Sequence, residues 1–183
     1  MPSRWSHLNS IARVVSVFVL TLRLITFFSD VPLVAAASAV VDSQQNAARQ
    51  IEVFQPEQFL TLTNADRADR GIAPLVLNDQ LNAAALAKAE DMAQKGYWDH
   101  FRPSDGKAPW DFIKENGYSY KVAGENLAKG YRTPNGITSA WMNSPAHKAN
   151  LLSAKYQEVG FACIEATIDG EQVLLTVQMF GSR

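Results

Sequence analysis

Residues 159–180, VGFACIEATIDGEQVLLTVQMF, decide the fold class of this chain. Two runs rich in β-branched and apolar residues, Val159–Ile168 and Gln172–Phe180, flank the dipeptide Asp169-Gly170. Asp-Gly is a strong short-range signal for a β-hairpin, because both residues can adopt the positive φ that the tight turn requires. The C-terminal end is therefore predicted to be two antiparallel strands.

Upstream of this hairpin, apolar residues recur at helical spacing. A helix is predicted from Pro56 to a stop at Gly71, because the fixed φ of proline suits a first helical position. An alanine-rich helix is predicted between the N-cap Asn78 and Gly96. Further signals are a short helix that ends at Gly117, turns at Gly124-Glu125-Asn126 and Asn135-Gly136, and a helix capped by Ser144-Pro145. Helices first and strands last favour an α+β domain with helices packed on a small antiparallel sheet.

The N-terminal residues 1–39 are typical of a targeting segment. Basic residues near the start precede an apolar run over 14–28, and small residues at 37–39 supply a cleavage site. Arg23 interrupts the apolar run, which would be costly at the centre of a membrane span. The segment is predicted to be a cleaved signal peptide, with an uncleaved anchor as the alternative, so the protein is expected to be secreted or held at the cell envelope. Membrane contact is expected only if the segment stays uncleaved.

The remaining sequence is predicted to comprise a polar linker over 40–55 and one domain over 56–183. Without residues 1–39 the formal net charge is −3, and no run of lysine or arginine occurs. No nucleic-acid partner is therefore expected. Cys163 is the sole cysteine, which excludes an intramolecular disulfide framework, and its strand-like surroundings predict a buried small hydrophobe.

Three residues are the candidates for a functional site: His100, Glu125 and His147. The chain has three histidines, and two of them lie in polar, aromatic-flanked segments on either side of Glu125. Two imidazoles and a carboxylate could bind a divalent metal, or could form an acid/base group near neutral pH. A purely structural role is the third interpretation. With 24 residues between His100 and Glu125 and 21 between Glu125 and His147, a zinc motif on a single helix is excluded, so tertiary structure must bring the three together.

Several motifs, taken in order, resemble the CAP superfamily, which comprises the cysteine-rich secretory proteins, antigen 5 and pathogenesis-related 1 proteins (the SCP-like extracellular domain). The resemblance runs from about Phe59 to the C-terminus and is to the compact, disulfide-free bacterial form. The matching residues are Asn64, Arg67, Gly71, Leu75, the alanine-rich helix, His100, Gly124-Glu125-Asn126-Leu127-Ala128, Trp141 and Ser144-Pro145-Ala146-His147-Lys148-Ala149-Asn150-Leu151-Leu152.

The resemblance implies an α-β-α sandwich with an open groove lined by two histidines and acidic residues, which holds zinc in some members. Carried over by position, the groove residues are His100, Glu125 and His147, with the two histidines as the zinc ligands. Animal members usually add a second glutamate shortly after the tryptophan. Here residues 141–144 carry no acid, which argues against an activity that needs all four groups.

These observations predict a secreted CAP-domain protein whose groove binds an extracellular ligand: a lipid, a peptide or a cell-envelope component. The alternative is a metal-assisted hydrolase, peptidase-like, that uses the same groove. A cell-envelope interaction protein with an unused groove is a third possibility. Ser144 is predicted to be a helix cap and not a nucleophile, and Trp98, Phe101, Trp110 and Trp141 are predicted to form the wall under the groove.

Overall fold

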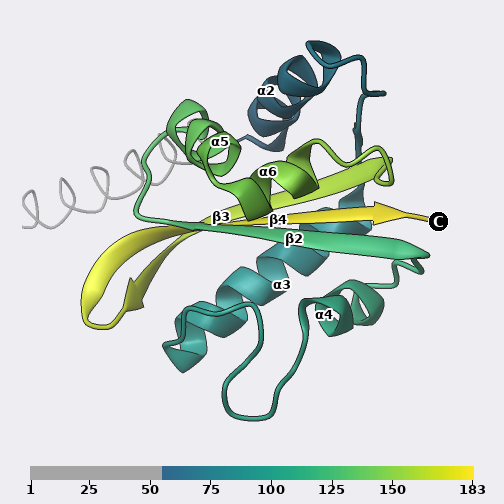
Figure 1. The fold of residues 1–183 in the computed structure, drawn as a ribbon. Helices are drawn as coiled ribbons and strands as arrows, with labels where there is room; N and C mark the ends of the chain where they lie inside the picture. Colours follow the sequence, from purple (N-terminus) through teal and green to yellow (C-terminus); the bar gives the residue numbers. More distant parts are fainter. Residues whose placement is uncertain (1–54) are drawn as a thin grey trace, which may run out of the picture. The chain divides into compact units, whose positions relative to one another are not determined.

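The structure is a computed structural model that describes residues 55–183. The predicted signal or anchor over 1–39 and the predicted linker lie outside the described residues, apart from Gln55, which precedes the first described helix. The elements, labelled as in Figure 1, are α2 (Pro56–Ala68), β1 (Val76–Leu77), α3 (Asp79–Lys95), α4 (Pro109–Glu115), β2 (Val122–Lys129), α5 (Pro134–Asn143), α6 (Pro145–Leu151), β3 (Glu158–Ile168) and β4 (Glu171–Ser182).

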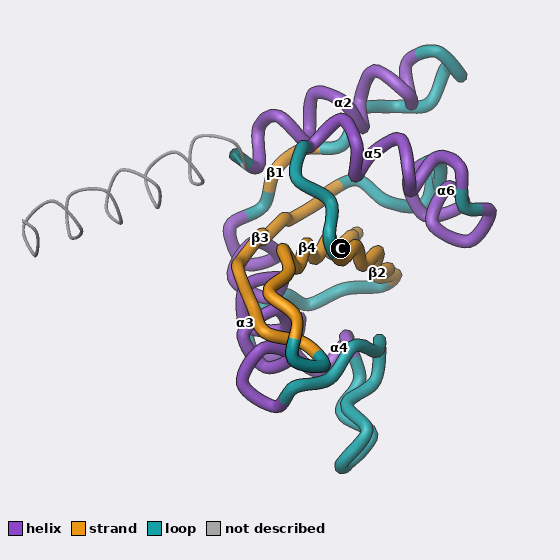
Figure 2. Tube along the Cα trace, turned by 90° about the vertical axis from the view of Figure 1, so that its left-hand side faces the viewer, coloured by secondary structure: helices purple, strands orange, loops and turns teal. Residues whose placement is uncertain are grey.

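Three layers make up this part of the chain. A four-stranded sheet in the order β1-β3-β4-β2 forms the middle layer. Helices α3 and α4 cover one face, and α2, α5 and α6 cover the other, as Figures 1 and 2 show. The expected α-β-α sandwich is therefore confirmed. The sheet is mixed and not wholly antiparallel, because the two-residue strand β1 pairs parallel with β3. Within residues 55–183 no helix has the length and apolar character needed to cross a membrane.

The C-terminal hairpin forms as predicted. Strands β3 and β4 pair antiparallel along their whole length, from Glu158 opposite Gly181 to Ile168 opposite Glu171. The turn residues Asp169 and Gly170 have φ of 54° and 82°, the positive values that the tight turn requires. This hairpin supplies the two central strands of the sheet.

Cys163 lies within β3. Its Sγ atom is 3.2 Å from Oγ1 of Thr176 on β4. Burial raises the pKa of the Cys163 thiol to about 11, so it stays protonated near neutral pH. The thiol therefore behaves as a structural group.

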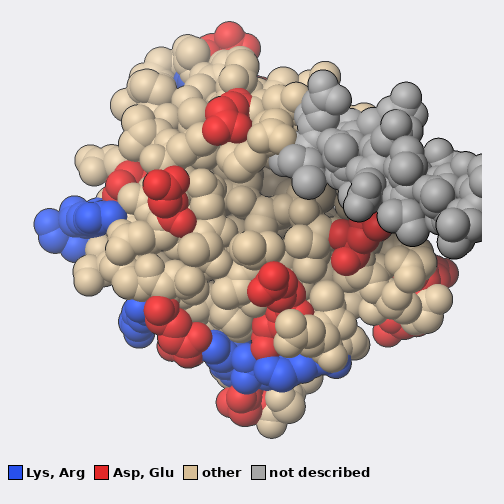
Figure 3. All heavy atoms as spheres, turned by 180° about the vertical axis from the view of Figure 1, so that it is seen from behind, with Lys and Arg blue, Asp and Glu red and all other residues tan. Residues whose placement is uncertain are grey.

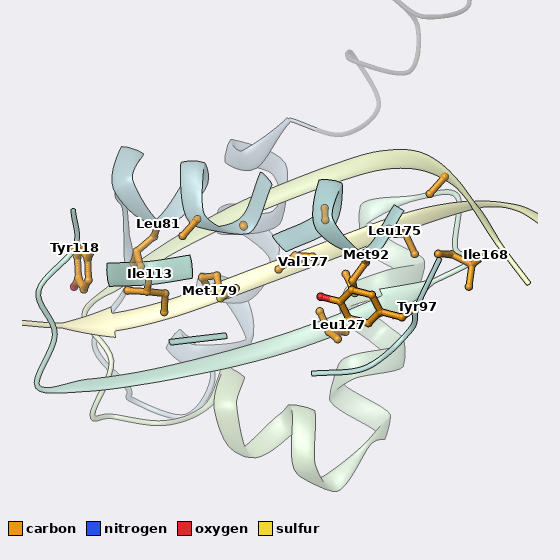
Figure 4. Close-up of a cluster of buried hydrophobic side chains, with 14 residues drawn as sticks. Leu81, Met92, Tyr97, Ile113, Tyr118, Leu127, Ile168, Leu175, Val177 and Met179 are labelled. Carbon is orange, nitrogen blue, oxygen red and sulfur yellow. The ribbon is translucent and has the colours of Figure 1, made fainter. Parts of the chain in front are cut away.

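The core between α3 and the sheet is the larger of two apolar clusters (Figure 4). The helix begins as predicted, because Oδ1 of Asn78 accepts hydrogen bonds from the amides of Gln80 and Leu81. It ends at Gly96, whose φ of 65° is left-handed. Buried side chains of α3, α4 and the sheet then meet, including Leu81, Met92, Ile113, Val177 and Met179.

One glycine sets how closely α3 approaches the sheet. A methyl group on Gly160 of β3 would lie 2.1 Å from the carbonyl carbon of Leu81 and 2.2 Å from the amide nitrogen of Asn82. Real Cβ atoms do not come that close to a backbone, so the helix backbone rests directly on the strand at this point. The side chain of Asn82 completes the contact by accepting a hydrogen bond of 2.9 Å from the amide of Phe161.

The other face is organised around a buried arginine. Arg67 of α2 is 1% exposed, and its guanidinium donates to the carbonyl oxygens of Ala73, Leu151, Ser153 and Tyr156 at 2.8–3.3 Å. These acceptors offset the cost of burying the charge. The arginine thereby joins α2 to the end of α6 and to the turn that leads into β3.

Two local expectations were wrong, and a third was confirmed in position but not in its hydrogen bond. Residues 124–126 lie inside strand β2 and not in a turn, because this glycine is needed for close packing and not for chain reversal. Residues 135–136 belong to the first turn of α5, where the capping oxygen comes from Thr133. Ser144 does occupy the N-cap position of α6, but its side chain makes no capping hydrogen bond.

Charge is mixed on the face seen in Figure 3. Acidic side chains there are separated by uncharged residues, and basic side chains gather toward the lower edge. Neither sign of charge covers this face.

We expect Gly160→Ala to destabilise the domain strongly. The added methyl group meets the α3 backbone, which cannot rotate away as a side chain can, so the cost should reach or exceed the upper end of the ~1–3 kcal/mol typical of overpacking. Chemical denaturation measures the change in the free energy of unfolding. Gly136→Ala is the matched control: its new methyl group would be 3.1 Å from Oγ1 of Thr133, a side-chain atom, in a helix that favours alanine. Equal stability of both variants would contradict the close contact.

Candidate functional site

The three candidate residues come from three different elements around β2. His100 lies in the loop between α3 and α4, Glu125 lies in the middle of β2, and His147 lies in the first turns of α6. Figure 1 shows that the loop and α6 belong to opposite outer layers of the sandwich, with β2 at the edge of the sheet between them. The sheet edge is therefore the place where the two layers can contribute to one site.

His100 and Glu125 are in direct contact. Nδ1 of His100 lies 2.5 Å from Oε1 of Glu125, a short charge-assisted hydrogen bond. The His100 side chain is 48% exposed and that of Glu125 is 1% exposed. The carboxylate thus holds the ring at Nδ1, while about half of the His100 side chain stays exposed. The other carboxylate oxygen, Oε2, is buried without a protein partner.

Both groups of the pair have a pKa above their ordinary value, His100 because of Glu125 and Glu125 because of burial. The hydrogen bond with Glu125 raises the pKa of His100 by more than burial lowers it. Burial raises the pKa of Glu125, although the bond from His100 and the charge of Lys88 offset part of that rise. Near neutral pH, His100 is therefore biased toward the imidazolium form, in which Nε2 carries a proton and donates.

His147 is held through its backbone. Nδ2 of Asn126 donates to the His147 carbonyl oxygen at 3.2 Å and to Oε1 of Gln178 at 3.0 Å. Asn150, one turn further along α6, donates to the carbonyl of Glu125 at 3.0 Å and to Oδ1 of Asn126 at 2.9 Å. These amides bind α6 to β2. Burial, and then the charge of His100, lower the pKa of His147, so its ring is neutral near pH 7.

The groove beside the pair has a volume of about 390 Å³. Its lining comprises Asp99, His100, Phe101, Pro109, Trp110, Ala123, Gly124, Glu125, Asn150 and Tyr156. Two of the four aromatic residues expected in the wall, Phe101 and Trp110, are present. Trp141 of α5 is instead buried in the second apolar cluster, and its indole donates to the carbonyl of Leu127 at 3.0 Å. The sequence analysis missed Asn150 and Tyr156.

Tyr156 owes its place in the groove to a glycine. A methyl group on Gly124 would lie 2.4 Å from the Tyr156 hydroxyl oxygen, so only glycine leaves room for that ring. The hydroxyl donates to the carbonyl of Ala123 at 3.2 Å. Along β2 the carbonyls of Ala123, Glu125 and Leu127 thus each accept a side-chain hydrogen bond from the layer that contains α5 and α6.

Two buried charges beneath the loop were also missed. Lys88 of α3 is 0% exposed and donates to the carbonyls of Asp99 and His100. Asp91, one turn along, accepts two hydrogen bonds from the guanidinium of Arg102 at 2.9 and 2.7 Å. Burial alone would raise the pKa of Asp91, but its hydrogen bonds, that with Arg102 foremost, hold the value at about 2. A signal existed in the sequence: Lys88 falls on the apolar stripe of the alanine-rich helix, where a charge is unusual.

The donor set determines which metal centre these residues fit. The Glu125 carboxylate is committed to His100 Nδ1, the position of an outer-shell partner and not of a ligand. Across the described chain, no group of three or more His, Cys, Asp or Glu residues is arranged to hold a metal ion. With Glu125 committed, the donors left for an ion are the two imidazoles and solvent, and residues 55–183 form no centre with three protein ligands.

Comparison with known proteins identifies the family to which this chain belongs. Residues 60–180 match the family model described as the cysteine-rich secretory protein family, CAP. The chain belongs to this family. It is 37% identical over 131 residues to the uncharacterized protein YkwD of Bacillus subtilis, which is 72% of this chain and 50% of that protein. It is 30% identical over 112 residues to the uncharacterized membrane protein YlbC of the same organism, or 61% of this chain and 32% of that protein. The chain thus spans half or less of these relatives.

Solved structures from other bacteria share the fold. An extracellular protein with an SCP domain from Bacillus anthracis superposes with a TM-score of 0.60 at 24% identity, covering 70% of this chain and 40% of that one. An outer surface protein from Borrelia burgdorferi gives 0.58 at 23% identity, covering 68% of this chain and 89% of that one. At such identities the likeness extends to the fold alone.

We expect the pKa values of the two histidines of the metal-free protein to be shifted in opposite directions from the ordinary value of about 6.5. His100 should titrate above it, because of Glu125, and His147 below it, because of burial. For His100 the folded pKa exceeds the unfolded one, so its contribution to stability is fully present below about pH 6.5 and is lost as the pH rises through the folded pKa. NMR titration of the ring protons measures both midpoints.

The variant Glu125→Gln tests whether Glu125 causes the raised pKa of His100. It removes the negative charge while keeping a hydrogen-bonding oxygen, so the His100 midpoint should fall, and that of His147 should rise slightly because the His100 charge that lowers it is reduced. A His100 midpoint at or below that of His147 in the unmodified protein would contradict the paired geometry.

Proposed function

We propose that this CAP domain is an extracellular binding module whose groove takes a peptide segment. The observation that carries the proposal is the groove itself: a half-exposed imidazole fixed by a buried carboxylate, beside an aromatic wall. Ligand sites in proteins commonly combine a largely apolar concave surface with a few fixed polar groups.

The polar groups favour a peptide over a purely apolar ligand. Protonated His100 offers a donor at Nε2, and the Asp99 carboxylate, whose Oδ1 also accepts from the amide of Phe101 at 3.1 Å, offers acceptors. A peptide has both a carbonyl for the first and an N–H for the second, whereas a fatty acid has acceptors only. An apolar side chain of the peptide would pack on Phe101 and Trp110.

The local charge supports an uncharged ligand backbone. The ionisable side chains at and under the pair are Lys88, Asp99, His100 and Glu125, two of each sign when His100 is protonated. A strongly charged ligand would gain little from such a balanced site. A neutral amide can be bound by hydrogen bonds alone.

A capped neutral tripeptide, acetyl-Ala-Phe-Ala-amide, tests the proposal against decanoate as the lipid-like probe. We expect the peptide to shift the NMR signals of the His100 ring and the Trp110 indole saturably, and decanoate to shift them less. His100→Gln should weaken peptide binding about tenfold, the value of a ~1.4 kcal/mol hydrogen bond to a charged donor. Lys148→Gln, at an exposed position outside the groove lining, also removes one positive charge and serves as the matched control.

Tighter binding of decanoate would reassign the groove to lipids. Absence of saturable shifts with either probe would contradict a groove that binds such ligands. The peptide signal should also strengthen as the pH falls, because protonation of His100 supplies the donor.

Zinc binding is a separate proposal for the same ring. His100, through Nε2, and His147 are the residues that would hold the ion, which would supply a Lewis-acidic position. We expect saturable zinc binding by metal-free protein from Val40 onward, purified without a histidine tag, and its loss in the His100→Ala/His147→Ala double variant. Zinc needs neutral imidazoles, so its affinity should rise with pH, the reverse of peptide binding. Equal zinc uptake by both proteins would overturn this assignment.

Different observations bear on extracellular placement and on catalysis. The relative from Bacillus anthracis is an extracellular protein, which supports export of this chain. The metal-assisted hydrolase remains a prediction from the sequence, and the three-ligand centre it requires is not formed by residues 55–183. We therefore favour binding over hydrolysis.

A further inference from the structure

Lys88 is a fully buried charged side chain in the core of this domain. It is 0% exposed on α3, whose other buried residues, apart from Asp91, are alanine, leucine and methionine. Burial lowers the pKa of Lys88, although the charges of Glu125 and Asp91 counter part of that effect. An apolar side chain of similar volume at such a site is often neutral or stabilising. Stability of the core alone therefore does not explain a lysine here.

The contacts of Lys88 indicate what the charge does. An ammonium group has three donors and no acceptor. Nζ donates to the hydroxyl of Tyr97 at 3.1 Å, to the carbonyl of Asp99 at 2.9 Å and to the carbonyl of His100 at 2.8 Å. All three donors are used, and the aromatic rings of Tyr97 and Phe112 lie 4.8 and 5.6 Å from Nζ.

Two of these acceptors flank one residue. The carbonyl of Asp99 belongs to the peptide unit that precedes the His100 Cα atom, and the carbonyl of His100 belongs to the unit that follows it. Fixing both units fixes the direction of the Cα–Cβ bond between them, and hence where the imidazole can reach. The neighbouring charge, Asp91, binds side chains of the same loop, those of Tyr97 and Arg102, and no carbonyl beside His100.

We propose that Lys88 is a positioning residue of the site: its ammonium holds the two peptide units around His100 and thereby sets the His100 ring on Glu125. The helix α3 thus controls the geometry of a groove that its own side chains do not line. A hydrogen bond as short as that between His100 and Glu125 requires both groups to be held in place, and Glu125 is held by strand β2.

The test uses the free, metal-free protein. The Nδ1 proton of His100, in a 2.5 Å bond with Glu125, should give a far-downfield NMR signal. We expect Lys88→Met, which keeps the length and apolar stem, to lose this signal while the remaining amide spectrum stays native-like. Lys88→Arg, which can still donate to both carbonyls, should restore it. Lys95→Met is the matched control, because Lys95 lies on the same helix and its ammonium donates to Asp91 instead of the carbonyls beside His100.

A downfield signal unchanged in Lys88→Met would overturn the proposal, even if that variant melts at lower temperature. Loss of the signal in Lys95→Met as well would also overturn it, since the effect would then reflect the loop and not Lys88. Where Lys88→Met does not fold, Lys88→Leu, which also lacks a donor, replaces it: retention of the signal overturns the proposal, and loss supports it. The readout needs no ligand, so it stands or falls separately from peptide binding.

Discussion

The architecture depends on a backbone contact between helix α3 and strand β3. Gly160 lets the helix rest on the sheet without an intervening side chain, which fixes the height and rotation of α3 over the central strands. Because the helix is fixed, its residues at 88 and 91 come to lie under the loop that carries His100. The position of a groove residue is thus determined, through buried charges, by a packing contact in the middle of the sheet.

The opposite layer is anchored in a different way. Arg67 holds the chain that leaves α6 through backbone carbonyls, and amide side chains hold α6 itself to β2. Each layer therefore brings one histidine to the edge of the sheet by its own set of buried polar groups. Glu125, on the strand between them, contacts the histidine from one layer and, through its carbonyl, an amide from the other. The site therefore lies where the two outer layers meet at β2, and a different set of buried polar groups holds each layer in place.

The features predictable from the sequence were those set by local physics. The hairpin at Asp169-Gly170, the cap at Asn78 and the order of helices and strands follow from turn and capping chemistry. The pairing of His100 with Glu125 was expected mainly through the family resemblance, because no local rule joins residues 25 positions apart. Gly124 was interpreted as a turn residue. The sequence does not distinguish a glycine required for the close approach of a side chain, here Tyr156, from one required for positive φ. The partners of Lys88 depend on a loop conformation that spacing does not encode.

The bonds that tie β2 to its neighbours have a further consequence for how the molecule meets copies of itself. Strand β2 is an outer strand of the sheet, and outer strands usually present a row of backbone acceptors that can template another strand. Here the outward carbonyls from Ala123 to Leu127 are already occupied by a phenol, an amide and an indole. Strand addition at this edge would have to displace all three. The interactions that hold the groove together therefore also protect the domain against edge-to-edge aggregation.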